Sequence, residues 1–253
     1  NPDFADLDGI CRRFAAAGRT GVVVALGGGS VIDAAKVLAA AGGDFARVRD
    51  HLVAGAPLDP ALILPVLAVP TTAGTGSEVT CWATVWDTAG GRKYSIAHER
   101  LYPEAAIIDP ALTLAAPRGL TLATGLDALS HALESLWNVN ANPVSARHAI
   151  AAAGIVLEVL PRLVERLDDL DLRSRQAEAS LLAGLAFSNT KTALAHNISY
   201  DVTLRHGTAH GIACSFSLPQ VMRWAIGQDA ECDRRLAAIF GPDLGAGADR
   251  LQR

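Results

Sequence analysis

Four residues, one aspartate and three histidines, have the types and spacing of a metal site. Asp127 and His131 are four positions apart, so on a helix they share a face and can meet at one point. His196 and His210 lie farther apart, as expected for two converging elements, and can complete the set. One carboxylate with three neutral imidazoles suits a divalent transition-metal ion. No thiolate takes part in this predicted set, which excludes a zinc-ribbon type of structural site.

The neighbours of these residues decide between a metal site and ordinary packing. A single histidine on an apolar helix is more often a packed or surface residue than a ligand. Here, however, apolar residues flank Asp127 and His131, namely Leu126, Ala128, Leu129, Ala132 and Leu133. A buried carboxylate without a partner is costly, and a metal ion would be that partner. Glu134 could orient a ligand imidazole, although an exposed charge fits the sequence slightly better.

Composition limits the class of protein. The chain has 253 residues, half of them apolar, which suits helices packed on each other and on a buried parallel sheet in one or two domains. A net charge of −4 gives no electrostatic case for nucleic acid or an anionic membrane. We find no signal peptide and no apolar run of transmembrane length. The cysteines form no CxxC pair and indicate reduced thiols in a cytoplasmic protein, namely Cys11, Cys81, Cys214 and Cys232.

A glycine-rich turn is the first candidate cofactor site. An apolar, β-branched run ends in Gly27, Gly28 and Gly29, and a helical stretch starts at Ser30. Strand, glycine turn and helix form the layout of a phosphate cradle, because glycines allow close backbone approach and the helix start offers free N–H groups. Ser30 and Asp33 fit a capping box, and Asp33 joins the predicted cofactor residues. A tight turn without a ligand is the alternative.

A second strand followed by a hydroxyl-rich loop strengthens the cofactor hypothesis. Residues 62–70 predict a buried strand, and Thr75 with Glu78 would again form a capping box. Loops at two strand ends indicate a ligand at the carboxyl edge of a parallel sheet. Hydroxyls and backbone N–H groups there suit a diphosphate, a ribose or a nicotinamide amide. The predicted contacts in this loop are Thr71, Thr72, Thr75 and Ser77.

The rest of the chain divides into a hairpin and a helical half. Residues 82–95 predict a hairpin, in which Lys93 is the one cation suited to a nucleotide, although a solvated lysine fits as well. A last strand is predicted at 105–109. From Leu120 onward helical periodicity dominates, with helices expected at 121–137, 144–167, 174–188, 190–200 and 211–225. The predicted domains are therefore 1–117, α/β and dinucleotide-binding, and 118–253, helical and metal-binding.

Taken together, these stretches resemble the iron-containing (group III) alcohol dehydrogenases. The matching stretches follow the family's order and are 25–36, 70–80, 125–134, 187–189 and the pair His196 and His210-Gly211. The resemblance implies the dehydroquinate synthase-like fold of this family, with a Rossmann-like parallel sheet followed by an all-helical domain. It implies metal ligands at Asp127, His131, His196 and His210, holding Fe²⁺ or Zn²⁺, and NAD or NADP between the domains.

The chain departs from the family pattern at its ends and at one position in the site. Relatives have a further α/β segment before the glycine motif and further helices after the last one here, so the chain looks truncated at both ends. Many relatives also carry a second histidine four residues after the third ligand, where this chain has Tyr200. On a helix Tyr200 shares the face of His196. Its hydroxyl could bond the substrate or simply pack.

The implied reaction is hydride transfer between NAD(P)H and a small aldehyde or alcohol, with the metal as Lewis acid. The predicted catalytic residues are Tyr200, His206 and His210, the first two as proton carriers. Asn189, Lys191 and Arg205 are predicted to bind substrate, because the sequence around Lys191 looks like the branch that reduces phosphonoacetaldehyde to 2-hydroxyethylphosphonate. Solvated surface positions fit Lys191 and Arg205 equally well.

Three alternatives stay open beside that reading. They are a general short-chain alcohol dehydrogenase of the butanol or lactaldehyde type, a dehydroquinate synthase-like lyase, and a non-catalytic paralogue that serves as an interaction module. We expect a cytoplasmic homo-oligomer, a dimer, with a small-molecule substrate and no nucleic-acid or membrane partner.

Overall fold

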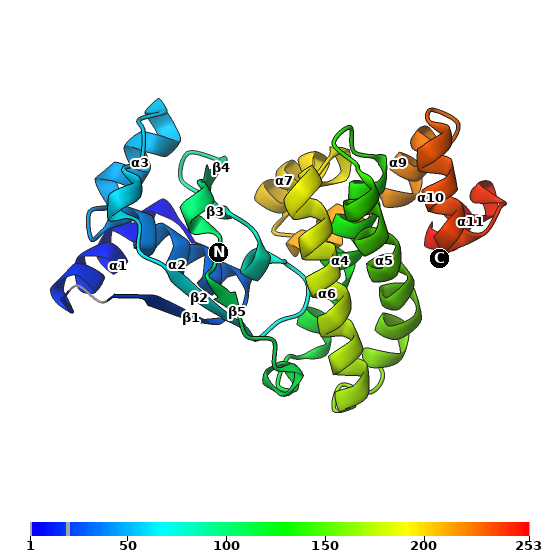
Figure 1. Cartoon of the computed structure of the whole chain (residues 1–253), viewed down its shortest axis with the longest axis horizontal. Helices are drawn as coiled ribbons and strands as arrows, with labels where there is room; N and C mark the ends of the chain where they lie inside the picture. Colours follow the sequence, from blue (N-terminus) through cyan, green and yellow to red (C-terminus); the bar gives the residue numbers. More distant parts are fainter. Residues whose placement is uncertain (1, 19–20, 253) are drawn as a thin grey trace. The chain divides into compact units, whose positions relative to one another are not determined.

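The computed structural model describes residues 2–18 and 21–252, which form two compact units (Figure 1). Unit 1 comprises Asn1–Thr71 and Ser77–Asp109, and unit 2 comprises Thr72–Gly76 and Pro110–Arg253. The expected order of a parallel sheet followed by a helical part is confirmed. The units divide after Asp109, and the loop Thr72–Gly76 belongs to the helical unit. The predicted boundary near Pro117 stays a prediction.

Unit 1 is built on a parallel sheet in the order β1-β2-β5, with β1 at Val23–Gly27, β2 at Val66–Pro70 and β5 at Ala105–Ala106. Gly27 pairs with Pro70, so β1 and β2 end side by side. One face of β1 packs into the core through Val23 and Ala25. Its other face carries Val24 and Leu26, which are 60% and 59% exposed. The helices of this unit are α1 (Phe4–Ala16), α2 (Gly29–Ala41) and α3 (Phe45–Ala54).

A two-stranded hairpin completes unit 1. Strands β3 (Trp82–Asp87) and β4 (Arg92–Ala97) pair antiparallel, which confirms the predicted hairpin. Short 3₁₀ turns connect the elements, and η2 (Ser77–Val79) follows the hydroxyl-rich loop. The other turns are η1 (Pro60–Leu62), η3 (Glu99–Leu101) and η4 (Pro110–Thr113).

Unit 2 is helical, and its long helices α4 (Arg118–Trp137), α5 (Pro143–Leu163) and α6 (Leu170–Thr190) share one core. Many core residues are alanines, which let the helices approach closely. The predicted helix at 211–225 is instead two helices. Pro219 lies in the first turn of the second one, where its missing N–H costs nothing. The remaining helices are α7 (Leu194–His206), α8 (His210–Ser215), α9 (Leu218–Ala225), α10 (Ala230–Phe240) and α11 (Leu244–Gln252).

Helix α5 bears on the expectation that the chain has no apolar run of transmembrane length. It is the one helix in the described part of the chain that could cross a membrane on length and composition alone. Its residues Ala149, Ala152 and Val156 lie in the core shared with α4 and α6, and the core helix of a folded domain meets the same test.

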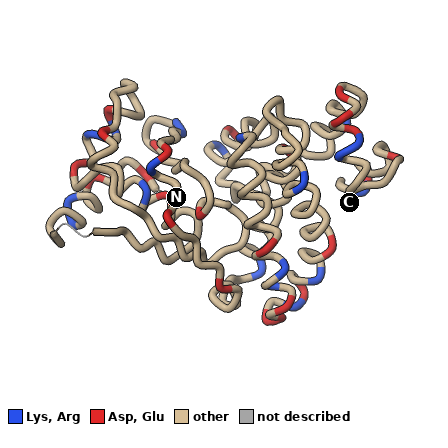
Figure 2. Tube along the Cα trace, in the orientation of Figure 1, with Lys and Arg blue, Asp and Glu red and all other residues tan. Residues whose placement is uncertain are grey.

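Acidic and basic side chains are interspersed around the turn from α5 to α6 (Figure 2).

Candidate metal centre

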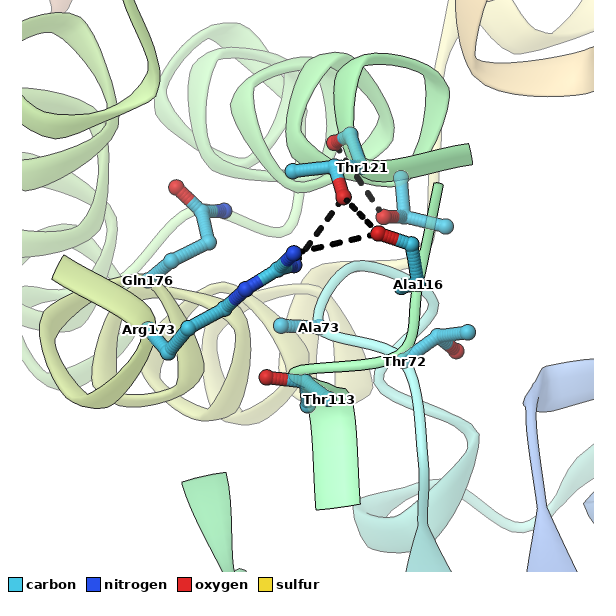
Figure 3. Close-up of a pocket in the computed structure, with 8 residues that line it drawn as sticks. Thr72, Ala73, Thr113, Ala116, Thr121, Arg173 and Gln176 are labelled. Atoms are coloured by element: carbon cyan, nitrogen blue, oxygen red, sulfur yellow. Dashed lines mark hydrogen bonds between the residues drawn. The ribbon is translucent and has the colours of Figure 1, made fainter. Parts of the chain in front are cut away.

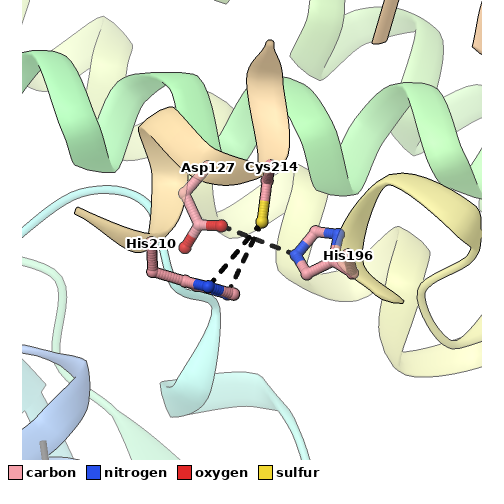
Figure 4. A group of neighbouring side chains, drawn as sticks. All are labelled: Asp127, His196, His210 and Cys214. Carbon is pink, nitrogen blue, oxygen red and sulfur yellow. Dashed lines mark hydrogen bonds and ion pairs between the residues drawn. The ribbon is translucent and has the colours of Figure 1, made fainter. Parts of the chain in front are cut away.

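Donor atoms from three helices converge in unit 2 (Figure 4). Asp127 on α4, His196 on α7, and His210 and Cys214 on α8 each offer one ligand atom, and these atoms lie within 4.8 Å of one another. His131 lies one helical turn beyond Asp127, with its Nε2 3.8 Å from Asp127 Oδ1. The structure therefore brings the four predicted ligands to one region and adds a thiol to them.

Two glycines allow the backbones around this region to approach closely. A Cβ on Gly211 would lie 1.9 Å from the carbonyl oxygen of Ala123, so α8 could not pack on α4 with a larger residue there. A Cβ on Gly74 would lie 2.1 Å from the carbonyl oxygen of Thr124. Helices α7 and α8 are joined by the turn at 207–209, which begins with Gly207 at a φ of 65°.

Each histidine of the cluster has an oxygen atom beside its Nδ1. Each of these oxygens can accept a hydrogen bond from Nδ1–H, which favours the tautomer that leaves the lone pair on Nε2. This arrangement orients imidazoles for metal binding. The pairs are His196 with Glu134 Oε2 at 2.5 Å, His131 with the Gly74 carbonyl at 3.3 Å, and His210 with Ser199 Oγ at 3.5 Å.

Glu134 joins the start of α7 to α4. Its fully buried carboxylate accepts hydrogen bonds from the backbone N–H groups of Ala193 and Ala195 as well as from the His196 ring. Burial alone would raise the pKa of Glu134, but the bond from His196 and then the backbone bonds hold it below its ordinary value. Of the two roles open at the sequence level, the structure supports orientation of an imidazole.

Two buried polar atoms at the centre of the cluster lack a hydrogen bond. Within the described ranges, no group bonds Asp127 Oδ1 or His196 Nε2, although both residues are at least nine-tenths buried. The two atoms are 3.6 Å apart. A buried carboxylate oxygen and an imidazole lone pair without partners are costly, and a divalent cation would satisfy both. The donor chemistry therefore fits a metal ion.

Cys214 lies beside the predicted donor set, although the sequence analysis gave it no place there. Its Sγ lies 3.6 Å from Nε2 of His210, and the residue is fully buried. The signal was present in the sequence, because Cys214 follows His210 by four positions, the same spacing that linked Asp127 to His131. Composition alone had assigned all the cysteines as plain thiols.

Of the predicted catalytic residues, two are neighbours. The Tyr200 ring lies nearly parallel to that of His210, with ring centroids 6.1 Å apart and an interplanar angle of 8°. His206 is the exposed last residue of α7. A direct role for each residue stays a prediction.

Two of the predicted substrate residues, Arg205 and Asn189, bond groups outside the cluster. The Arg205 guanidinium pairs with Asp201 at 2.6 Å on an exposed face of α7. The Asn189 amide donates to the carbonyl oxygen of Leu185 on its own helix. Lys191 is exposed in the turn before α7 and has a φ of 67°. Substrate contact by these residues stays a prediction.

The predicted cofactor loops of unit 1 lie side by side. The Thr71 N–H donates to the carbonyl oxygen of Gly27 at 2.9 Å, which joins the ends of β2 and β1. The expected capping box at Ser30 and Asp33 does not form. The N-cap of α2 is Gly28, and no side chain caps the helix there. Thr75 and Glu78 were expected to cap an α-helix. A short 3₁₀ turn, η2, follows Thr75 instead. Gly29, Thr72 and Lys93 keep their predicted cofactor roles as predictions.

Asp33 and Lys36 brace the loop that follows β2, a role that the sequence did not reveal. Asp33 accepts hydrogen bonds from Ser77 Oγ at 2.5 Å and from the Thr84 N–H at 2.8 Å. The fully buried Lys36 ammonium donates to three carbonyl oxygens, those of Ser77, Thr80 and Trp82, at 2.6, 2.6 and 2.8 Å. A lysine among the apolar residues of α2 was the available signal.

A small polar cavity of about 10 Å³ lies between α4, α6 and the Thr72–Ala73 loop (Figure 3). Arg173 lines it and donates to Thr121 Oγ1 at 2.9 Å and to the Ala116 carbonyl at 3.1 Å. Gln176 is buried beside it, and no residue that the structure describes bonds either atom of its amide. The cavity has room for one water molecule, which could satisfy that amide.

Comparisons with known proteins match both parts of the chain to family models. The family model "Iron-containing alcohol dehydrogenase" matches residues 1–110, and "Fe-containing alcohol dehydrogenase family, C-terminal" matches residues 121–250. Phosphonoacetaldehyde reductase of Streptomyces viridochromogenes is 42% identical over 212 residues, covering 81% of this chain and 53% of its own length. NAD-dependent methanol dehydrogenase of Bacillus methanolicus is 36% identical over 222 residues, covering 88% and 58%.

A solved structure agrees with these matches. Sulfoacetaldehyde reductase from Bifidobacterium kashiwanohense in complex with NAD⁺ superposes with a TM-score of 0.92 at 34% identity, over 99% of this chain and 66% of that one. The chain spans about half the length of the curated relatives that it matches.

Proposed function

Because the chain belongs to the iron-containing alcohol dehydrogenase family, we propose that it transfers hydride between NAD(P)H and a small aldehyde at the cluster of unit 2. The observation that carries this proposal is the pair of orphaned atoms, Asp127 Oδ1 and His196 Nε2, among imidazoles whose Nδ1 atoms face oxygens. A merely structural cluster of buried polar groups would bond them to each other. Here Asp127 Oδ1 and His196 Nε2 have no hydrogen-bond partner among the described residues, and both could bind an ion.

The ion would be held by Asp127, His196 and His210, with His131 as the predicted fourth ligand. Fe²⁺ agrees with the family description, and Zn²⁺ suits the same donors. When bound, such an ion supplies Lewis acidity toward the substrate oxygen. Glu134 keeps His196 in the required tautomer, and Tyr200, beside His210, is the proposed hydrogen-bond donor to the substrate.

The cofactor would bind where β1 and β2 end together. Gly27–Ser30 lead from β1 into the start of α2, and Thr71 at the end of β2 bonds Gly27; the N-terminus of a helix favours a diphosphate. Gly28→Val should raise the NAD(P)H dissociation constant about tenfold or more, because a branched side chain would stand where phosphate must meet backbone. An unchanged constant in a fluorescence titration would remove this loop from the cofactor site.

For the substrate, we propose a small aldehyde that bears an anionic group. Two of the similar proteins are named for aldehydes of this kind, phosphonoacetaldehyde and sulfoacetaldehyde. Lys191, exposed just before the helix that carries His196, could meet a phosphonate or sulfonate. The second candidate is an uncharged short-chain alcohol, because a methanol dehydrogenase is also similar.

Steady-state kinetics can test this function. We expect kcat/KM to be at least tenfold higher for phosphonoacetaldehyde or sulfoacetaldehyde than for butanal, and Lys191→Ala to remove most of that preference. Arg234→Ala, which changes an exposed arginine paired with Glu231 on α10, is the control and should leave the ratio unchanged. A preference for butanal would support the uncharged substrate. Metal and NADH binding without reduction of any of the three aldehydes would support the non-catalytic paralogue.

The assembly and the compartment are separate proposals. We keep a homodimer and a cytoplasmic location as predictions, and light scattering coupled to size-exclusion chromatography tests the first.

A further inference from the structure

We propose that the small polar cavity beside Arg173 binds one monovalent anion of about the size of a water molecule, namely chloride. All residues that line this cavity belong to unit 2, and none of them is a proposed metal ligand. The inference therefore concerns a second site and does not depend on the proposed function.

Arg173 is a buried charge without a charged partner. The residue is 3% exposed, and its guanidinium donates to the carbonyl oxygens of Leu167 and Ala116 and to Thr121 Oγ1. All three acceptors are uncharged. Asp169, four residues earlier in the chain, pairs with Arg166 instead. A buried charge that lacks a partner of opposite charge is costly, and a bound anion would be that partner.

The guanidinium also has donor capacity left over. Each of its two terminal nitrogens carries two hydrogens. Nη1 makes one bond, to Thr121, and Nη2 makes one bond, to Ala116, in the described ranges of the chain. Each terminal nitrogen therefore keeps one N–H group for an acceptor in the cavity that Arg173 lines.

Gln176 provides a second, independent observation. It is 2% exposed, lines the same cavity, and forms no hydrogen bond through its amide nitrogen or oxygen with any residue that the structure describes. Arg173 and Gln176 are three residues apart on α6 and so share a face of this helix. Figure 3 shows the amide nitrogen of Gln176 on the side of Arg173 and the amide oxygen on the far side. Two sets of donors thus face one small space.

The size and the lining of the cavity select the ligand. A volume of about 10 Å³ holds one particle of about water size. Phosphate, sulfate and the diphosphate of a dinucleotide are too large, and a cation would meet the positive charge of Arg173. A water molecule could accept the free N–H groups, but it would leave that charge unpaired. A single halide ion accepts the same bonds and also neutralises the charge.

The threonines at the wall are compatible with an anion. Thr113 Oγ1 donates to the Pro110 carbonyl, and Thr124 Oγ1 donates to the Leu120 carbonyl. Hydroxyl hydrogens can rotate, so both groups could turn toward a bound ion.

A bound anion would stabilise the folded unit. Arg173 joins α6 to Ala116, just before α4, and to Thr121 in the first turn of α4. A ligand that binds only the folded chain raises its stability with ligand concentration. Chloride should therefore stabilise the protein more than a bulky monovalent anion at equal ionic strength.

Bromide locates the site directly. Crystals of the wild-type protein soaked in sodium bromide should show an anomalous difference peak between the guanidinium of Arg173 and the amide of Gln176. The peak should be absent from crystals soaked in sodium gluconate. A bromide-soaked crystal with only a water molecule in the cavity would overturn the inference.

Thermal unfolding tests the site in solution. With sodium chloride replacing sodium gluconate at constant ionic strength, we expect the Tm of the wild type to rise by about 5 °C and then saturate. Gln176→Met keeps the size of the side chain but removes the amide, and should lose most of this shift. Gln220→Met, at an exposed glutamine of α9, is the control and should keep it.

Equal Tm values of the wild type in the two salts would contradict the proposal, and so would an undiminished shift in Gln176→Met. Because the bromide map and the salt comparison both use the wild type, a variant that fails to fold does not affect the decision.

Discussion

Nδ1 of His196 donates to Oε2 of Glu134 across 2.5 Å, and the same carboxylate accepts the backbone N–H groups that begin α7. One side chain of α4 thus fixes both the tautomer of a proposed ligand and the place where its helix starts. The orientation of His196 is therefore set by α4 as much as by its own helix.

Glu134→Gln should separate these two tasks. Glutamine keeps the size and one acceptor oxygen, but the charged partner of the imidazole is lost. We expect Zn²⁺ affinity to fall about 10- to 100-fold, the range typical when a partner of a ligand histidine is changed, while circular dichroism stays native. Glu158→Gln, at an exposed carboxylate paired with Arg175, is the control. Equal affinities in the two variants would mean that Glu134 does not orient the ligand.

Gly211→Ala tests the close approach of α8 to α4. The new Cβ would lie 1.9 Å from the carbonyl oxygen of Ala123, so α8 must move and take His210 with it. We expect a loss of about 2 kcal/mol or more in the free energy of unfolding, as for overpacking, together with weaker metal binding. Gly154→Ala, in α5 with open space around it, should instead stabilise the protein by about 0.5–1 kcal/mol. Native metal affinity in Gly211→Ala would contradict the prediction.

Lys36 predicts a pH dependence of stability. Burial lowers its pKa from 10.5 to about 8, and the opposing charges of Asp33, Glu78 and Cys81 only partly offset this. Between pH 8 and pH 10.5 the unfolded chain therefore binds more protons at this residue than the folded chain does. In that window the free energy of unfolding should rise with pH because of Lys36, by about 3 kcal/mol in all.

Lys36→Met should remove this contribution. Urea unfolding of both proteins at a series of pH values from 7.5 to about 10 gives the comparison, because other alkaline titrations cancel in the difference. We expect the free energy of unfolding of the wild type, relative to that of the variant, to increase as pH rises. Parallel curves would show that the carbonyl oxygens around Lys36 keep its pKa near the ordinary value.

Lys191→Gly tests whether strain is stored beside the site. Lys191 is the only residue other than glycine with a positive φ in the described chain, at φ 67° and ψ 175°, a region that glycine favours. Its carbonyl oxygen accepts hydrogen bonds from Asn138 and Thr190, which hold the turn in place. We expect the glycine variant to be about 1 kcal/mol more stable than Lys191→Ala, which keeps the strain. Equal stability of the two variants would argue against strain.

Local sequence patterns predicted the parts of the site that lie on one element. The i to i+4 spacing placed Asp127 and His131 on α4, and the glycine run placed the turn between β1 and α2, because both depend on periodicity and backbone conformation alone. The break between α8 and α9 at Pro219 was missed, although proline carries a local signal, because apolar residues continue on both sides.

Contacts between distant residues could not be predicted in the same way. Asp33 fitted a capping box by spacing, yet its carboxylate bonds Ser77 and Thr84, which the packing of η2 and of the hairpin on α2 brings near. Arg205 was adjacent in sequence to the ligand region, but helix geometry turns it toward Asp201. Charge and spacing propose candidates, whereas tertiary contacts decide among them.

The exposed turn at 207–209 has a consequence for the lifetime of the protein in a cell. It joins two helices that contact α4 around a buried carboxylate oxygen without a hydrogen bond, so a bound ion would hold α7 and α8 in place. An ion that binds only the folded chain lowers the population of locally opened forms. We expect iron or zinc starvation to expose this turn to proteases first, so that metal supply would set the abundance of the protein.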